Sequence, residues 1–305
     1  MKIKHYFFLL FLGIFSISNA QHLIKPNGDV SAKPDLPKVR KLSPEAVANA
    51  KNLRISGKTS KEIAAMLKKE NATAPEVYHS MKPSVSDSEN VGALCTAGYT
   101  IWEITETLKM DGKTALETTH LLKNSEGCTF IRNLVLRAVK ETYRIRLDDM
   151  VSIIRAKYTE IPGEIVDVLL TLSPNDSETI DAIGYGGLAT NCREVCILLN
   201  GKLRYFNRGQ LSQVLQTLMR SRMGGSVDRN FNYADGLMVF EPAPIEILVA
   251  FKNVYFSSTD ARTALELAKI GKHLNISRDD VSTFLRGRSY TATQVLDALQ
   301  ATYGS

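Results

Sequence analysis

The sequence lacks the short motifs that mark the common catalytic sites. It contains no Gly-x-Ser-x-Gly, no His-Glu-x-x-His and no glycine-rich phosphate-binding loop. Histidine is scarce as well: beyond residue 20 only His22, His79, His120 and His273 occur, and each stands apart from any motif. Nucleophilic and metal catalysis therefore have no visible site. We expect no enzyme activity, no cofactor and no metal centre.

Cysteine is also sparse, with four residues: Cys95, Cys128, Cys192 and Cys196. Cys192 and Cys196 are four positions apart on a predicted helix, a spacing that offers two thiolates to a metal. However, no Cys-x-x-Cys pair and no nearby histidine completes such a site. The four cysteines allow three disulfide pairings, and buried thiols remain the alternative to disulfides.

Long hydrophobic runs are absent except at the start of the chain. Lys2 and Lys4 precede an apolar run from Tyr6 to Phe15, and the small residues Ser18 and Ala20 follow it. This order is typical of a secretory signal peptide, and the run is shorter than the roughly 20 residues of a membrane-spanning helix. We expect residues 1–20 to be removed after Ala20 and the mature chain to be secreted or periplasmic, without a transmembrane segment, in a compartment that permits disulfides.

The charge balance gives little reason to expect a polyanionic partner. The chain has 38 basic and 32 acidic residues. Loss of Lys2 and Lys4 with the signal leaves 36 against 32, a net charge of +4. The composition, 44% hydrophobic and 23% charged, is that of a globular chain.

A six-position signature recurs along the chain after a Pro- and Lys-rich linker at 21–42. An acidic or amide residue is usually followed by an apolar residue or Thr, and by a second apolar residue four positions later. The clearest copies lie in the stretch Tyr99–Lys123, where Thr100 and Thr114 are expected to cap two short helices. The paired positions are Ile63/Leu67, Val77/Met81, Ile104/Leu108, Thr118/Leu122, Met150/Ile154, Ile165/Leu169, Thr179/Ile183, Val195/Leu199, Leu211/Leu215, Ile247/Phe251, Thr263/Leu267, Val281/Leu285 and Val295/Leu299.

Many successive copies start roughly 14 to 18 residues apart, which suits one short helix and a turn. The acidic residue falls in the first helical turn, where it favours the helix dipole and can close a capping box. We predict an all-α fold of tandem short helical hairpins, either an α-solenoid or a compact multi-helix superhelix. Helical repeats should occupy 43–219 and 245–305. The intervening 220–244, where Gly224-Gly225, Asn230 and Asn232 interrupt the pattern, is expected to be a loop or insertion.

The repeated unit resembles two kinds of known helical repeat. Gly98-Tyr99-Thr100, Glu103-Ile104 and Leu108-Lys109 resemble bacterial two-helix tandem repeats, a likeness that implies a superhelical scaffold and no particular activity. The stretch Gly112–Thr118 with Leu121-Leu122 is similar to the second helix of transcription-activator-like effector repeats, which bind DNA. No other unit repeats that motif, and sequence readout needs a regular array.

The most unusual local composition lies between residues 202 and 233, where basic and aromatic residues alternate and no acidic residue occurs before Asp228. Such a mixture suits an anionic surface, a glycan or a protein partner, while a solvated face plus a loop is the simpler interpretation. The candidate binding residues, called the basic patch below, are Lys202, Arg204, Tyr205, Arg208, Arg220, Arg222, Arg229, Phe231 and Tyr233.

The sequence as a whole favours an exported, non-enzymatic scaffold or binding module for a protein or glycan partner. The first alternative is an enzyme whose site forms across the repeat surface from residues distant in sequence. The second is a nucleic-acid-binding repeat protein. Trp102, the single tryptophan, is expected in the core or at a partner contact.

Overall fold

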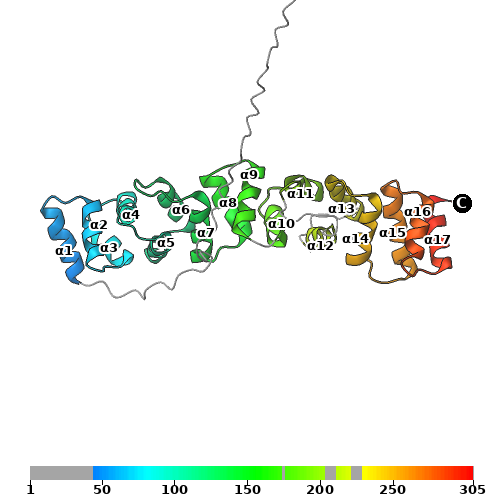
Figure 1. Cartoon of the computed structure of the whole chain (residues 1–305), viewed down its shortest axis with the longest axis horizontal. Coiled ribbons are helices and arrows are strands. Elements are labelled where there is room, and N and C mark those ends of the chain that lie inside the picture. The colour runs from blue at the N-terminus through cyan, green and yellow to red at the C-terminus, as the bar shows by residue number, and fades with distance from the viewer. Residues whose placement is uncertain (1–43, 174–175, 203–210, 221–228, 305) are drawn as a thin grey trace, which may run out of the picture. The chain divides into compact units, whose positions relative to one another are not determined.

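A computed structural model describes residues 44–173, 176–202, 211–220 and 229–304 (Figure 1). The predicted signal segment 1–20 and linker 21–42 lie outside the described residues. Within them the chain forms seventeen α-helices, one short 3-10 helix and no strand. The prediction of an all-α fold is therefore confirmed. None of the helices described is long and apolar enough to cross a membrane.

The helices are short, between eight and thirteen residues each. The first nine are α1 (Pro44–Ile55), α2 (Ser60–Lys69), α3 (Ala74–Met81), α4 (Asp87–Thr96), α5 (Ile101–Met110), α6 (Ala115–Asn124), α7 (Arg132–Tyr143), α8 (Leu147–Lys157) and α9 (Pro162–Leu172). The others are α10 (Asp176–Tyr185), α11 (Cys192–Leu199), α12 (Leu211–Arg220), α13 (Arg229–Leu237), η2 (Met238–Phe240), α14 (Pro244–Val254), α15 (Ala261–His273), α16 (Arg278–Arg286) and α17 (Ala292–Tyr303).

The helices begin where the sequence places its caps. Thr100 accepts a hydrogen bond from the Glu103 amide, and the Glu103 carboxylate accepts one from the Thr100 amide at 2.7 Å. The same reciprocal capping box begins α2, α6 and α17, and at the start of α3 the Thr73 amide donates to the Glu76 carboxylate. The hydrogen bond from the Thr114 backbone lowers the pKa of Glu117, as expected for a carboxylate that holds a helix terminus. In these helices the recurring acidic residue therefore has a structural role.

The apolar pairs of the signature form the core. All thirteen pairs are buried, including the polar Thr118, Thr179 and Thr263. Trp102 is also buried, at 6% exposure, so it belongs to the core rather than to the surface. Helices this short are marginal alone, because nucleating a helix is unfavourable and few hydrogen bonds follow. Their stability therefore depends on burying one face against neighbouring helices.

The helices pack in two rows (Figure 1). Each odd-numbered helix packs on the next odd-numbered helix from α1 to α17, and each even-numbered helix packs on the next from α2 to α14. Most helices also pack on the helix that follows them in the chain. This consecutive pairing is consistent with tandem helical repeats. One step breaks the rule, because α14 and α16 make no comparable close approach.

A lysine and a tyrosine tie each of several helices to the next helix of the same row. At the end of α2, the Lys68 ammonium donates to the Gly98 carbonyl and lies 4.4 Å from the centre of the Tyr99 ring. The Tyr99 hydroxyl in turn donates to the Ala72 carbonyl at 2.6 Å. This arrangement, called the Lys–Tyr clasp below, places a positive charge at the carbonyl end of α4, where the helix dipole favours it.

The clasp recurs twice in full, both times between helices of the odd-numbered row. Lys109 donates to the Thr142 carbonyl at 2.6 Å beside Tyr143, whose hydroxyl donates to the Lys113 carbonyl at 2.8 Å. The C-terminal copy joins Lys272 to Thr302 and Tyr303, and the Tyr303 hydroxyl donates to the Ile276 carbonyl at 2.9 Å. In every copy the tyrosine reaches the residue four positions after the lysine. The clasp therefore fixes three helix ends at once.

The segment 229–237 differs from the sequence-based expectation of a loop or insertion. It forms α13, which packs on α11 and α15 in the odd row. Asn230, Asn232 and Gly236 have low helix propensity, which hid the helix in the sequence. Tertiary packing outweighs that propensity: a Cβ at Gly236 would lie 3.2 Å from the Cβ of Cys192, so glycine allows α13 to approach α11 closely.

Candidate functional site

The structure describes five of the nine residues of the basic patch, and it separates them. Arg204, Tyr205, Arg208 and Arg222 lie outside the described residues. Arg220, the last residue of α12, and Arg229, the first residue of α13, are exposed. Tyr233 is 1% exposed, and its hydroxyl faces the Leu218 carbonyl at 3.4 Å, so it belongs to the core and not to a surface.

The two remaining patch residues make contacts within the helical rows. The Lys202 ammonium donates to the Gly163 carbonyl at 3.0 Å and to the Asp167 carboxylate at 2.6 Å, which ties the end of α11 to α9. The Phe231 ring stacks on the ring of His273, with centroids 4.5 Å apart. Of the described patch residues, the exposed Arg220 and Arg229 best suit contact with a partner.

Arg220 contributes to the electrostatics of α10. Burial raises the pKa of Asp181, while the guanidinium groups of Arg220 and Arg146 oppose that rise and Asp148 adds to it. Asp181 Oδ1 is buried and has no hydrogen-bond partner among the described residues. A carboxylate in this position is costly to ionise, so it weakens the folded state at neutral pH.

The cysteines divide into one disulfide and two buried thiols. Cys95 on α4 and Cys128 after α6 are joined, across 33 positions of sequence. A Cβ at Gly92 would lie 2.3 Å from the Glu126 carbonyl oxygen, so the chain around Cys128 packs directly on the α4 backbone. Cys192 and Cys196 are buried and unpaired, and burial raises the pKa of Cys192 to about 12. Buried thiols of this kind are chemically inert.

Histidines with carboxylate partners occur on the surface, but none belongs to a larger ligand set. His273 Nε2 lies 2.7 Å from Asp235 Oδ1, and His79 Nδ1 lies 3.8 Å from Asp111 Oδ1. Asp111 also pairs with Lys82, so His79 borders a charge network rather than an open site. No group of three or more potential metal ligands gathers within the described ranges.

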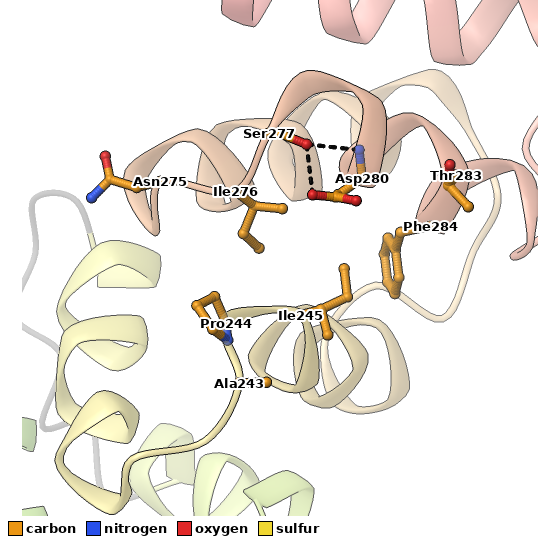
Figure 2. A pocket seen from close by; sticks show the side chains of 9 residues that line it. All are labelled: Ala243, Pro244, Ile245, Asn275, Ile276, Ser277, Asp280, Thr283 and Phe284. Carbon is orange, nitrogen blue, oxygen red and sulfur yellow. Dashed lines mark hydrogen bonds between the residues drawn. The ribbon is translucent and has the colours of Figure 1, made fainter.

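A hollow of about 580 Å³ opens between the start of α14 and the start of α16 (Figure 2). Its walls are mostly apolar: Pro244 and Ile245 face Ile276 and Phe284 across the space, as Figure 2 shows. Ile276 and Phe284 are each only 9% exposed, so these walls belong to the core and not to a loose surface. The hollow lies where the packing of the even-numbered row is interrupted, between α14 and α16.

Polar groups line the edge of the hollow. Asn275, Ser277, Asp280 and Thr283 contribute side chains, and Asp280 is the one ionisable residue among those that line it. The Ser277 hydroxyl donates to Asp280 Oδ2 at 2.6 Å, and the Asp280 amide donates to Ser277 (Figure 2). Sequence reasoning missed this site, because Asp280 fits the recurring acidic position of the signature and none of the apolar signature pairs lines the hollow.

Comparison with known protein families, with curated proteins and with solved structures finds no match to this chain.

Proposed function

We propose that the chain is an exported, non-enzymatic helical-repeat scaffold that binds a protein or glycan partner. The helices bury their apolar faces against one another in two rows. The residues that stay exposed therefore determine what the surface can bind. Export is supported by the disulfide between Cys95 and Cys128, since such bonds persist in oxidising compartments.

The observation that carries the proposal is a set of three exposed apolar side chains in neighbouring repeats, called the apolar edge below. Ile131 is 70% exposed between α6 and α7, and Ile161 is 58% exposed between α8 and α9. Tyr185, at the end of α10, is also 58% exposed. Burying these side chains against a partner would release apolar surface from water, which favours binding.

Hydrogen bonds between successive connections hold the apolar edge together. The Lys123 ammonium donates to the Lys157 carbonyl, which links the ends of α6 and α8. The Arg155 guanidinium donates to the Gly187 carbonyl at 3.4 Å, which links the ends of α8 and α10. The three apolar side chains therefore belong to neighbouring repeats whose helix ends are joined by hydrogen bonds, and we expect a partner to contact them together.

Partner capture by the mature protein tests the proposal. The immobilised chain is incubated with an envelope extract of the source cells, and the retained protein and glycan are quantified. We expect Ile131→Ser, Ile161→Ser and Tyr185→Ser together to reduce capture at least tenfold, because aromatic and aliphatic anchors dominate interfaces. The matched control replaces Ile55 and Leu296, which are 76% and 57% exposed elsewhere, by Ser.

Two results would contradict the proposal. Equal capture by the edge variant and the control would remove the apolar edge from consideration. Retention of neither protein nor glycan by the unaltered chain would remove the scaffold function itself. Digestion of the extract with protease or with glycosidases before capture distinguishes the two classes of partner.

A further inference from the structure

The hollow between α14 and α16 is preformed, because hydrogen bonds fix the backbone on both sides of it. The Ala243 amide donates to the Glu246 carboxylate at 2.8 Å and holds the start of α14. The Tyr303 hydroxyl holds the Ile276 carbonyl at 2.9 Å on the other side. A ligand that enters this space finds its walls in place, which lowers the ordering cost of binding.

Among the residues that line the hollow, one carries a charge, the carboxylate of Asp280. The Arg288 guanidinium lies over the ring of the lining residue Phe284, 5.6 Å from its centre, but Arg288 itself does not line the hollow. A cationic group that enters the space therefore meets one negative partner, the Asp280 carboxylate.

We propose that this hollow receives a lysine or arginine side chain of a partner polypeptide. The aliphatic stem lies between Ile245 and Phe284, and the cationic head meets the Asp280 carboxylate. Such side chains combine an apolar stem with a charged end, which matches apolar walls that carry one carboxylate at the edge. Among the described residues no hydrogen bond reaches Asp280 Oδ1, so this oxygen is available for the cation. The proposal deepens the scaffold function and rests on it for the identity of the ligand as a polypeptide.

Three small probes of equal chain length test the chemistry directly. Hexylammonium, 1-hexanol and hexanoate are titrated into the mature protein labelled at the isoleucine methyl groups, and methyl chemical shifts are followed by NMR. We expect hexylammonium to shift Ile245 and Ile276 with at least fivefold higher affinity than hexanol, and hexanoate to bind more weakly than both.

Two substitutions test whether the preference for a cation comes from the Asp280 carboxylate or from the neighbouring charge. Asp280→Asn keeps an oxygen acceptor for the Ser277 cap, and it should abolish the preference for hexylammonium over hexanol. Asp279→Asn removes the neighbouring charge outside the hollow and serves as the matched control, with the preference retained. Thr283→Trp should fill the exposed edge of the space and block all three probes. Equal affinity for hexylammonium and hexanol in the unaltered chain would overturn the proposal.

A second copy of the chain is the competing occupant. Sedimentation that shows a concentration-dependent dimer, lost in Thr283→Trp, would overturn the proposal in favour of self-association. The probe titration is independent of the capture experiment, because probe binding at Ile245 and Ile276 requires no partner from the extract. Failure of the scaffold function would leave probe binding intact, and failure of probe binding would leave capture through the apolar edge intact.

Discussion

Removal of the Tyr99 hydroxyl should destabilise the N-terminal repeats measurably. Tyr99→Phe keeps the buried ring, which is 4% exposed, and deletes only the hydrogen bond to the Ala72 carbonyl. A neutral hydrogen bond contributes about 0.5–1.5 kcal/mol, and a carbonyl left without its donor adds to the loss. We therefore expect the free energy of unfolding to fall by about 1–2 kcal/mol. Lys68→Met should cost about 1 kcal/mol, because the Lys68 side chain is partly exposed.

Trp102 provides a local probe for this measurement. It is the single tryptophan, lies on α5 between the clasps of Lys68 and Lys109, and is buried. Urea unfolding followed by tryptophan fluorescence therefore reports on these repeats, while circular dichroism reports on all helices. Repeat proteins unfold in parts, so we expect Tyr303→Phe, at the C-terminal clasp, to change the dichroism curve and leave the fluorescence midpoint nearly unchanged.

A double-mutant cycle shows whether the two side chains act together. The ammonium of Lys68 lies over the Tyr99 ring, so we expect a coupling free energy of about 0.5–1 kcal/mol between the two substitutions. Lys69→Met is the control, since Lys69 is an exposed lysine at the same helix end that takes no part in the clasp. The reasoning would be refuted if Tyr99→Phe left the fluorescence midpoint unchanged, or if Lys69→Met cost as much as Lys68→Met.

Three further predictions follow from other contacts. Reduction of the disulfide between Cys95 and Cys128, which are 33 positions apart, should lower the free energy of unfolding by about 4 kcal/mol. Urea unfolding with and without reductant measures this difference, and unchanged unfolding curves would contradict the prediction. Burial raises the pKa of Asp181, so the folded state loses stability as pH rises through that pKa and the carboxyl ionises. Asp181→Asn should therefore raise the melting temperature more at pH 7 than at pH 4, and an equal rise at both pH values would refute the argument. Thr100→Ala should cost about 1 kcal/mol by loss of the N-cap of α5, and Thr100→Ser should restore it; a similar loss in both would show that the cap is not responsible.

Local features of the fold could be read from the sequence because each depends on a single helix. The pair Ile104 and Leu108 is buried because residues four positions apart share one helix face. Thr100 caps α5 because its side-chain oxygen reaches the first turn. Both facts need only helical geometry, so the signature predicted them.

The Lys–Tyr clasps were not predicted, although the sequence contains a signal for them. Tyr99 and Lys109 belong to the repeated pattern, but each pairs with a residue on another helix, two helices away in the chain. The lysine-to-tyrosine separations, 31 residues for Lys68 and Tyr99 and 34 for Lys109 and Tyr143, are a signal that a search for two-helix periods would find.

The basic patch shows where composition is insufficient. Tyr233 and Arg229 lie four positions apart, and composition gave them the same role. The structure exposes Arg229 because it is the first residue of α13 and lies at the end of the helix, whereas Tyr233 lies one turn further in and is buried. Which face of α13 is buried depends on its contact with α11, where Gly236 meets Cys192. That contact joins residues 44 positions apart, and no local pattern encodes it.

The hollow depends on the placement of whole helices. The signature pairs Ile247/Phe251 and Val281/Leu285 are equally buried, so the pattern treats α14 and α16 like any other neighbours in the even row. The segments that precede them differ, however: α13 continues directly into η2 before α14, whereas α15 is a single α-helix of 13 residues before α16. The repeat signature records only the buried pair of each helix and carries no information about these preceding segments. The signature therefore cannot predict that the step from α14 to α16 stays open, or that the space there has apolar walls and a carboxylate at its edge.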